Sequence, residues 1–206
     1  MMAMMFLRWM RDDRHLAVLV LFLASAGAAA AGLQTPGIPM TAAMRKDAAR
    51  IQDQLDRIAA EHEAGRTHPP RTVTFTENEL NAWIAGLIEA NSEDVLRELV
   101  LKLFADNRVE GKAFIDLSRA SLPLGLKPKM TLFFAARVIA REGAARIEFD
   151  KLFLEGQVIP IAVLDLMIAV ASGLGKSDAA SIKDWVALPD GIKDLRSRPG
   201  LVEITY

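Results

Sequence analysis

The sequence contains no cysteine and only three histidines in 206 residues. Without cysteine the chain cannot form disulfides, thiolate zinc sites, iron–sulfur clusters or a thiol nucleophile, and it cannot carry the acylated cysteine of a lipoprotein. Its formal net charge is only −1, because Lys plus Arg (25) nearly balance Asp plus Glu (26). The overall charge therefore provides no electrostatic attraction to nucleic acid, and we expect no nucleic-acid partner. Any attachment to a membrane must come from the polypeptide itself.

The motifs of common catalytic and metal sites are missing as well. The sequence has no G-x-S-x-G elbow, Walker loop, dinucleotide fingerprint or H-E-x-x-H pair. His15 borders an apolar segment, and His62 and His68 precede the region in which we expect a folded domain. Adjacent residues of a helix point in different directions, so Glu61, His62 and Glu63 do not make a metal site. We therefore expect no catalytic residue, no metal and no cofactor.

The N-terminal region reads as an export signal. Residues 16–33 form an uninterrupted apolar stretch that follows arginines between residues 8 and 14. Residues 25–32 are small and offer A-x-A-like cleavage sites, but the whole stretch is also close to the ~20 residues that span a bilayer as a helix. Residues 1–33 are therefore either a cleaved signal peptide or an uncleaved membrane anchor. Both alternatives place the rest of the chain outside the cytoplasm, in the periplasm.

Residues 34–70 are predicted to hold a linker and an amphipathic stalk helix. After a turn-rich break, Thr41 can cap a helix that runs to about Ala64. Its charged faces are typical of a stalk or of a helix lying across a domain surface, and His68-Pro69-Pro70 ends it. Its narrow apolar stripe consists of Met44, Ala48, Ile51, Leu55 and Ile58.

Residues 71–206 are predicted to form one α+β domain, which opens with a strand and a helix. Residues 72–76 alternate apolar and hydroxyl side chains as a half-buried strand does, and Thr76-x-x-Glu79 is a capping box for the next helix. The helical spacing then gives the broad apolar face of a helix laid on a sheet. That face consists of Leu80, Trp83, Ile84, Leu87 and Ile88.

A period of two follows from Val100 and predicts two hairpins. The first turns at Asp106-Asn107, and the second joins long strands, 130–141 and 145–158, at Glu142-Gly143. Strands of this length imply a strongly twisted or curved sheet. In the last strand the apolar residues before Asp150-Lys151 are out of phase with those after it, and a bulge there would reconcile them.

The C-terminal part begins with Pro160, which opens a helix to Ala171 that is apolar nearly all round except for Asp165. Such a helix must be covered by the sheet, by lipid or by a partner. We expect a short helix holding Ile182 and Trp185, a turn at 188–191 and a final strand at 201–206. The predicted fold is thus a curved, mostly antiparallel sheet with long strands, packed on an amphipathic helix and an apolar helix.

The segment Val73-Thr-Phe-Thr-Glu-Asn-Glu-Leu-Asn-Ala-Trp83 resembles the strand-to-helix opening of the YpmS-like family of small, membrane-anchored, extracytoplasmic bacterial proteins. Gly156-Gln-Val-Ile-Pro160 before an apolar helix and Trp185-Val-Ala-Leu-Pro-Asp-Gly191 before a last strand are similar to that family's order of elements. The resemblance covers about residues 71–206. It implies a curved sheet wrapped around a helix, akin to half of a tubular lipid-binding module, a role with envelope lipids and no catalytic residues.

Two functions remain open from the sequence. A curved sheet with a helix on its concave side can leave an apolar groove, and a membrane supplies acyl chains as ligands. Alternatively, the protein is a scaffold or assembly factor that binds a protein partner of an envelope complex through the stalk helix or a sheet edge. The residues predicted to contact lipid in the groove are Trp83, Leu132, Phe134, Val138, Leu154, Leu164 and Ile168.

Overall fold

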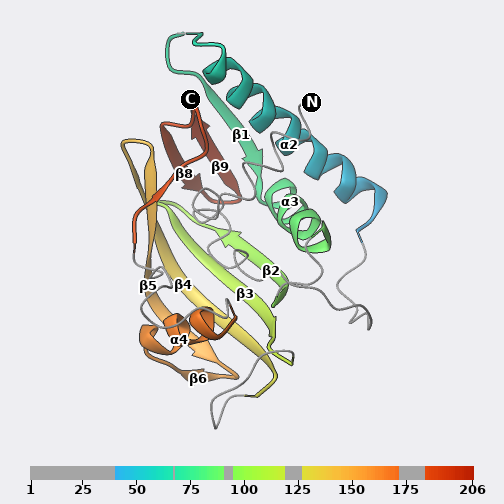
Figure 1. The fold of residues 1–206 in the computed structure, drawn as a ribbon, viewed down its shortest axis with the longest axis vertical. Helices are drawn as coiled ribbons and strands as arrows, with labels where there is room; N and C mark the ends of the chain where they lie inside the picture. Colours follow the sequence, from blue (N-terminus) through green and yellow to red (C-terminus); the bar gives the residue numbers. More distant parts are fainter. Residues whose placement is uncertain (1–39, 67, 91–94, 119–126, 172–183) are drawn as a thin grey trace.

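The computed structural model describes residues 40–66, 68–90, 95–118, 127–171 and 184–206 (Figure 1), with the side chains of residues 166 and 168–171 left aside. The predicted signal or anchor, residues 1–33, lies outside the described residues. The elements are α2 (Ala42–Glu63), β1 (Thr72–Thr76), α3 (Glu77–Ala90), β2 (Leu96–Leu103), β3 (Arg108–Asp116), β4 (Lys129–Arg141), β5 (Ala144–Leu154), β6 (Gln157–Val158), α4 (Ile161–Ala171), β7 (Val186–Ala187), β8 (Asp194–Arg198) and β9 (Leu201–Thr205).

The described strands form two antiparallel sheets. The larger, six-stranded sheet has the order β2-β3-β4-β5-β6, with β7 paired to one end of β5, and the smaller sheet has the order β1-β9-β8. The larger sheet curls as it crosses from β2 to β5, with α4 lying near β4 and β6, while α2 and α3 lie beside the smaller sheet (Figure 1). The α+β class with a curved antiparallel sheet is therefore confirmed, although the strands divide into two sheets and not one.

The predicted bulge in the long hairpin is present. The register of β4 and β5 pairs Ala135 with Lys151 but Ala136 with Phe149, so Asp150 is the extra residue on β5. An extra residue reverses the alternation of side chains along a strand. As a result, apolar residues on both sides of the bulge reach the same face of the sheet.

One predicted strand is too long. The chain reverses at Glu155-Gly156, with φ angles of 51° and 83°, and returns as β6, where Val158 pairs with Phe153. The prediction of a continuous strand from 145 to 158 is therefore wrong. The missed signal is a second Glu-Gly pair, because Glu142-Gly143 adopts the same left-handed backbone, with φ angles of 51° and 73°, in the neighbouring hairpin. Two successive residues with positive φ match the twist of tight antiparallel hairpins.

The prediction of a short helix around Trp185 is also wrong for the residues that the structure describes. Trp185 stands in extended chain just before β7, which pairs with the start of β5. Ile182 lies outside the described residues. The turn predicted at 188–191 is present, with the Ile192 backbone N–H donating to the Pro189 carbonyl oxygen at 3.0 Å.

Helix α2 begins where the sequence predicts. The Thr41 hydroxyl oxygen accepts a hydrogen bond from the Met44 backbone N–H at 3.2 Å. The helix lies across the surface beside α3 (Figure 1), and its Ile51 and Ile58 side chains are buried in the same cluster as Ile84. Of the two alternatives for this segment, the structure shows the helix lying across a domain surface.

Helix α3 starts with the predicted capping box. The Glu79 backbone N–H donates to the Thr76 hydroxyl at 3.2 Å, and the Glu79 carboxylate accepts from the Thr76 backbone N–H at 2.7 Å. Glu79 also forms an ion pair with Arg50 of α2. Burial alone would raise the pKa of Glu79, but the hydrogen bonds from Thr76 and Arg50 outweigh it and hold that pKa below its ordinary value. The helix start is thereby tied to both its own strand and α2.

Glycine is required at one position of the large sheet. Gly111 of β3 lies directly opposite Phe134 of β4, and a Cβ atom at residue 111 would stand 2.2 Å from the Phe134 ring. The aromatic ring therefore covers the bare glycine backbone. Such pairing of an aromatic residue with a strand glycine helps to pin the register.

We expect Gly111→Ala to lower the free energy of unfolding by about 1–3 kcal/mol, because the new methyl group displaces the Phe134 ring in a packed region. Chemical denaturation followed by circular dichroism measures this. Gly86→Ala is the matched control, since a Cβ there meets nothing closer than 3.6 Å. Within α3 that change gains helix propensity of up to about 1 kcal/mol. Equal effects of the two changes would contradict the close contact.

The boundary predicted at residue 71 stays a prediction, and the burial of α2 sets a test of it. Ile58 packs against the turn at Gly191, where an added Cβ would come within 2.9 Å of its Cγ2 atom. We expect Ile58→Ala to lower the free energy of unfolding by about 2–5 kcal/mol through lost burial and a cavity. Asp53→Ala, at an exposed position of the same helix, serves as the control. An unchanged melting transition for Ile58→Ala would show that α2 lies outside the cooperative unit.

Candidate functional site

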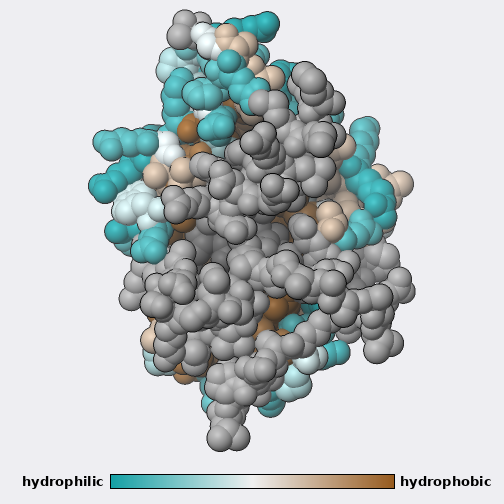
Figure 2. Space-filling model, in the orientation of Figure 1, coloured by the Kyte–Doolittle hydropathy of each residue, from teal (hydrophilic) through white to brown (hydrophobic). Residues whose placement is uncertain are grey.

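The large sheet has two faces of different character, called here the inner face and the outer face. The inner face carries the buried residues of β2 to β5 and belongs to the same core cluster as Leu164 and Met167 of α4. The outer face carries the alternate residues, most of them charged or exposed. Figure 2 shows hydrophilic residues along the upper and lateral edges of the molecule and small hydrophobic areas between them in both halves of the view.

The register brings part of the predicted lipid-contact set together. Leu132, Phe134 and Val138 alternate along β4, and Leu154 of β5 pairs directly with Leu132. All of them lie on the inner face, and Leu164 of α4 joins the same cluster. The side chain of Ile168, the sixth of these residues, lies outside the described part.

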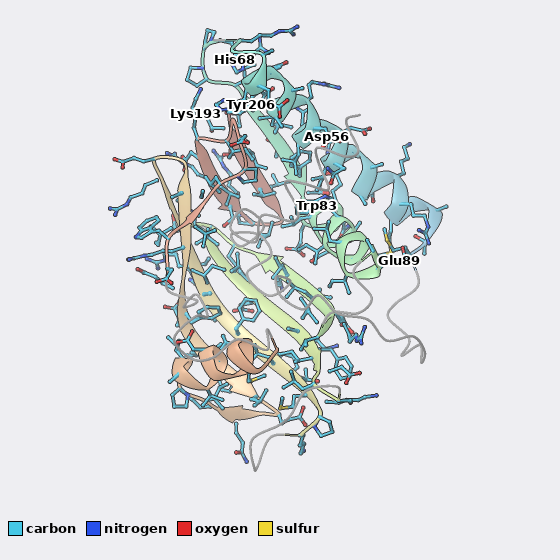
Figure 3. The ribbon with its side chains drawn as sticks, viewed as in Figure 1. Asp56, His68, Trp83, Glu89, Lys193 and Tyr206 are labelled. Atoms are coloured by element: carbon cyan, nitrogen blue, oxygen red, sulfur yellow. The ribbon has the colours of Figure 1, made fainter. Side chains whose placement is uncertain are left out.

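Trp83 lies apart from these residues. Its indole N–H donates to the Gln52 side-chain oxygen at 3.0 Å, so its polar edge faces α2 (Figure 3). Trp83 therefore packs between α2 and α3, whereas the other described residues of the predicted lipid-contact set lie on the large sheet and α4. The helical spacing predicted a packing residue at position 83. It did not show which neighbour Trp83 packs against, because α3 has α2 on one side and the large sheet on the other.

Burial varies along the inner face. Leu132 is 0% exposed and Leu164 is 1% exposed, so both are interior residues of a filled region. Val138 and Leu154 are half-buried, as are their neighbours Ile147 and Phe149. Phe134 packs edge-on against Phe149 with ring centroids 5.6 Å apart. The predicted groove is thus a packed core at Leu132 and Leu164, and apolar surface stays partly accessible beside it.

A mostly apolar row, interrupted by Lys112, crosses the outer face and was not predicted. The register aligns Val100, Lys112, Phe133, Phe153 and Val158 on five successive strands. Phe133 is 45% exposed and Val158 is 74% exposed. The alternation along β4 could have revealed this, because Phe133 and Phe134 are adjacent and must point to opposite faces.

Several charged groups on the surface have structural partners. The Glu155 carboxylate accepts from the Thr131 backbone N–H at 2.7 Å and lies near Lys127, and these contacts lower the pKa of Glu155. His68 lies 3.3 Å from the Glu61 carboxylate and packs edge-on against Tyr206 (Figure 3). Both clusters fasten chain segments to one another.

Within the described ranges, no three His, Asp or Glu side chains converge in a way that could hold a metal ion. Across the same residues, every helix is too short or too polar to cross a bilayer. No protein-family model, curated protein or solved structure shows significant similarity to this chain.

Leu164 tests whether this part of the inner face is a packed core. We expect Leu164→Ala to lower the free energy of unfolding by about 2–5 kcal/mol, because the side chain is fully buried. Val158→Ala also removes apolar carbons but from an exposed position, so its effect should stay within about 0.5 kcal/mol. Denaturant titration of both variants measures the difference. A small loss for Leu164→Ala would show that α4 is only loosely seated on the sheet.

Proposed function

We propose that the protein is a non-catalytic, extracytoplasmic protein of the cell envelope that binds acyl chains on the inner face of its curled sheet. The observation that carries this proposal is the change in burial along one apolar face. Leu132 and Leu164 are sealed, whereas Val138, Ile147 and Phe149 keep part of their surface accessible. An acyl chain needs only such apolar surface, since the hydrophobic effect is non-directional and scales with the buried area.

Export to the envelope would bring this surface to its ligand. The apolar stretch 16–33 behind a set of arginines supports a cleaved signal or an anchor, and both put the domain beside a lipid bilayer. The resemblance to the YpmS-like family supports the same role, because it implies half of a tubular lipid-binding module. The curled antiparallel sheet beside α4 is compatible with that architecture.

A second function, a scaffold that binds a protein partner of an envelope complex, is favoured by the outer row. Phe133, Phe153 and Val158 place apolar side chains on three adjacent strands of one sheet face, and Phe133 and Val158 are exposed. Contiguous exposed apolar surface often marks an interaction site. The two functions therefore use opposite faces of the same sheet, and substitutions on each face can separate them.

The test combines lipid identification with stability. We expect the full chain, extracted in neutral detergent, to co-purify with lipid detected by mass spectrometry, and added lipid to raise its melting temperature by mass action. Val138→Asp should weaken this stabilisation, because an ionised carboxylate opposes burial of an acyl chain. Val158→Asp on the outer face is the matched control and should leave it intact.

Two results would count against acyl-chain binding. If added lipid leaves the melting temperature of the unsubstituted chain unchanged, the protein does not bind that lipid. A loss of stabilisation in Val158→Asp but not in Val138→Asp would move the lipid site from the inner face to the outer face.

A further inference from the structure

Arginines gather on the outer face at the end of the β4–β5 hairpin. Arg137 and Arg141 alternate on β4, and Arg146 of β5 is paired with Ile139, which lies between them. On the next strand, Arg108 lies directly opposite Arg137. Residues that are opposite or diagonal across strands are within reach of one another when their side chains are long. The register therefore brings guanidinium groups from three strands onto one surface.

Trp185 completes this surface. The pairing of Ala145 with Val186 places Trp185 beside Arg146 on the outer face. The Arg141 guanidinium carbon lies 4.3 Å from the centre of the Trp185 ring system, and that of Arg146 lies 4.9 Å from it. Two cations thus share one half-buried indole, and a cation over an aromatic face is attracted to its electron-rich surface. We call Arg137, Arg141, Arg146 and Trp185 the arginine–tryptophan patch.

Arginines outnumber carboxylates on the strand positions of the patch, although Glu148 lies directly opposite Arg137, and Glu142 and Asp184 are the chain neighbours of Arg141 and Trp185. The strand positions around the patch supply two carboxylates, Glu110 and Glu148, against four arginines with Arg108 included. Glu148 forms an ion pair with Arg146. In the part of the chain that the structure describes, neither Arg137 nor Arg141 has a carboxylate within ion-pair distance. The Nε atom of Arg146 is buried and has no hydrogen-bond partner among the same residues.

We infer that the arginine–tryptophan patch binds the phosphate headgroup of an anionic lipid. Guanidinium groups present planar, paired N–H donors that match phosphate oxygens, and they stay charged at any physiological pH. An indole beside them suits the boundary between headgroups and acyl chains, where tryptophan is enriched. The site lies on the face opposite the acyl-chain surface, so substitutions on each face test the two proposals separately.

The test follows Trp185 fluorescence in the full chain. Trp9→Phe and Trp83→Phe leave Trp185 as the only tryptophan. The protein in neutral detergent is titrated with short-chain phosphatidylglycerol, with short-chain phosphatidylcholine and with glycerol phosphate. We expect phosphatidylglycerol to change the emission at the lowest concentration and added salt to weaken the response. Removing one arginine should raise the midpoint about fivefold, because each basic residue near an anionic membrane surface contributes about 1 kcal/mol of binding free energy.

Matched variants make the result specific. Arg137→Gln and Arg141→Gln should each raise the midpoint, and Arg141→Lys should also raise it, because lysine keeps the charge but loses the paired donors. Arg66→Gln, at an exposed position after α2, removes the same charge elsewhere and should change nothing. An equal response to phosphatidylcholine, or equal effects of Arg66→Gln and Arg141→Gln, would overturn the site. Glycerol phosphate binding as tightly as the lipid would assign the patch to free phosphate and overturn the lipid headgroup.

Discussion

The arrangement of the two sheets depends on side chains that complete the hydrogen bonding of strand edges. Asn81 of α3 both donates to the Leu101 carbonyl oxygen and accepts from the Leu101 backbone N–H, each at 2.8 Å. The Glu77 carboxylate accepts from the Leu103 backbone N–H at 2.7 Å. A buried backbone group without a partner costs free energy, and an open strand edge invites pairing with another chain. Helix α3 therefore takes the place of a further strand along β2.

Asn107 completes the hydrogen bonding of a strand edge in the small sheet. The side-chain oxygen of Asn107, in the turn between β2 and β3, accepts from the Ser197 backbone N–H of β8 at 2.7 Å. The Ser197 hydroxyl donates to the Phe104 carbonyl oxygen at 2.8 Å. The two sheets are thus joined through side chains, through α3 and through a backbone hydrogen bond from the Gly200 N–H to the Leu103 carbonyl oxygen at 3.1 Å, and not through a continuous ladder. This junction holds α3 and the core on one side of the large sheet, which is why that sheet has an inner and an outer face.

The division into faces organises both proposed binding surfaces. On the inner face, Leu132 and Leu164 are used for stability, and only the neighbouring apolar side chains remain accessible for a ligand. On the outer face, nothing within the described residues requires Phe133 or Arg141 for the core. The two proposals assign acyl chains to the inner face and lipid headgroups to the outer face.

Local sequence signals determined the ends and types of most elements. Thr41, the Thr76–Glu79 capping box, the Asp106-Asn107 turn and the bulge at Asp150 were all readable, because each depends on hydrogen bonds or backbone angles within a few residues. The second Glu-Gly turn was equally local and was overlooked. Only the tertiary structure decided that the strands form two sheets, that Trp83 faces α2 and that Arg141 and Arg146 meet at Trp185. These features depend on register and on contacts between distant segments, whose closure entropy and packing are properties of the whole chain.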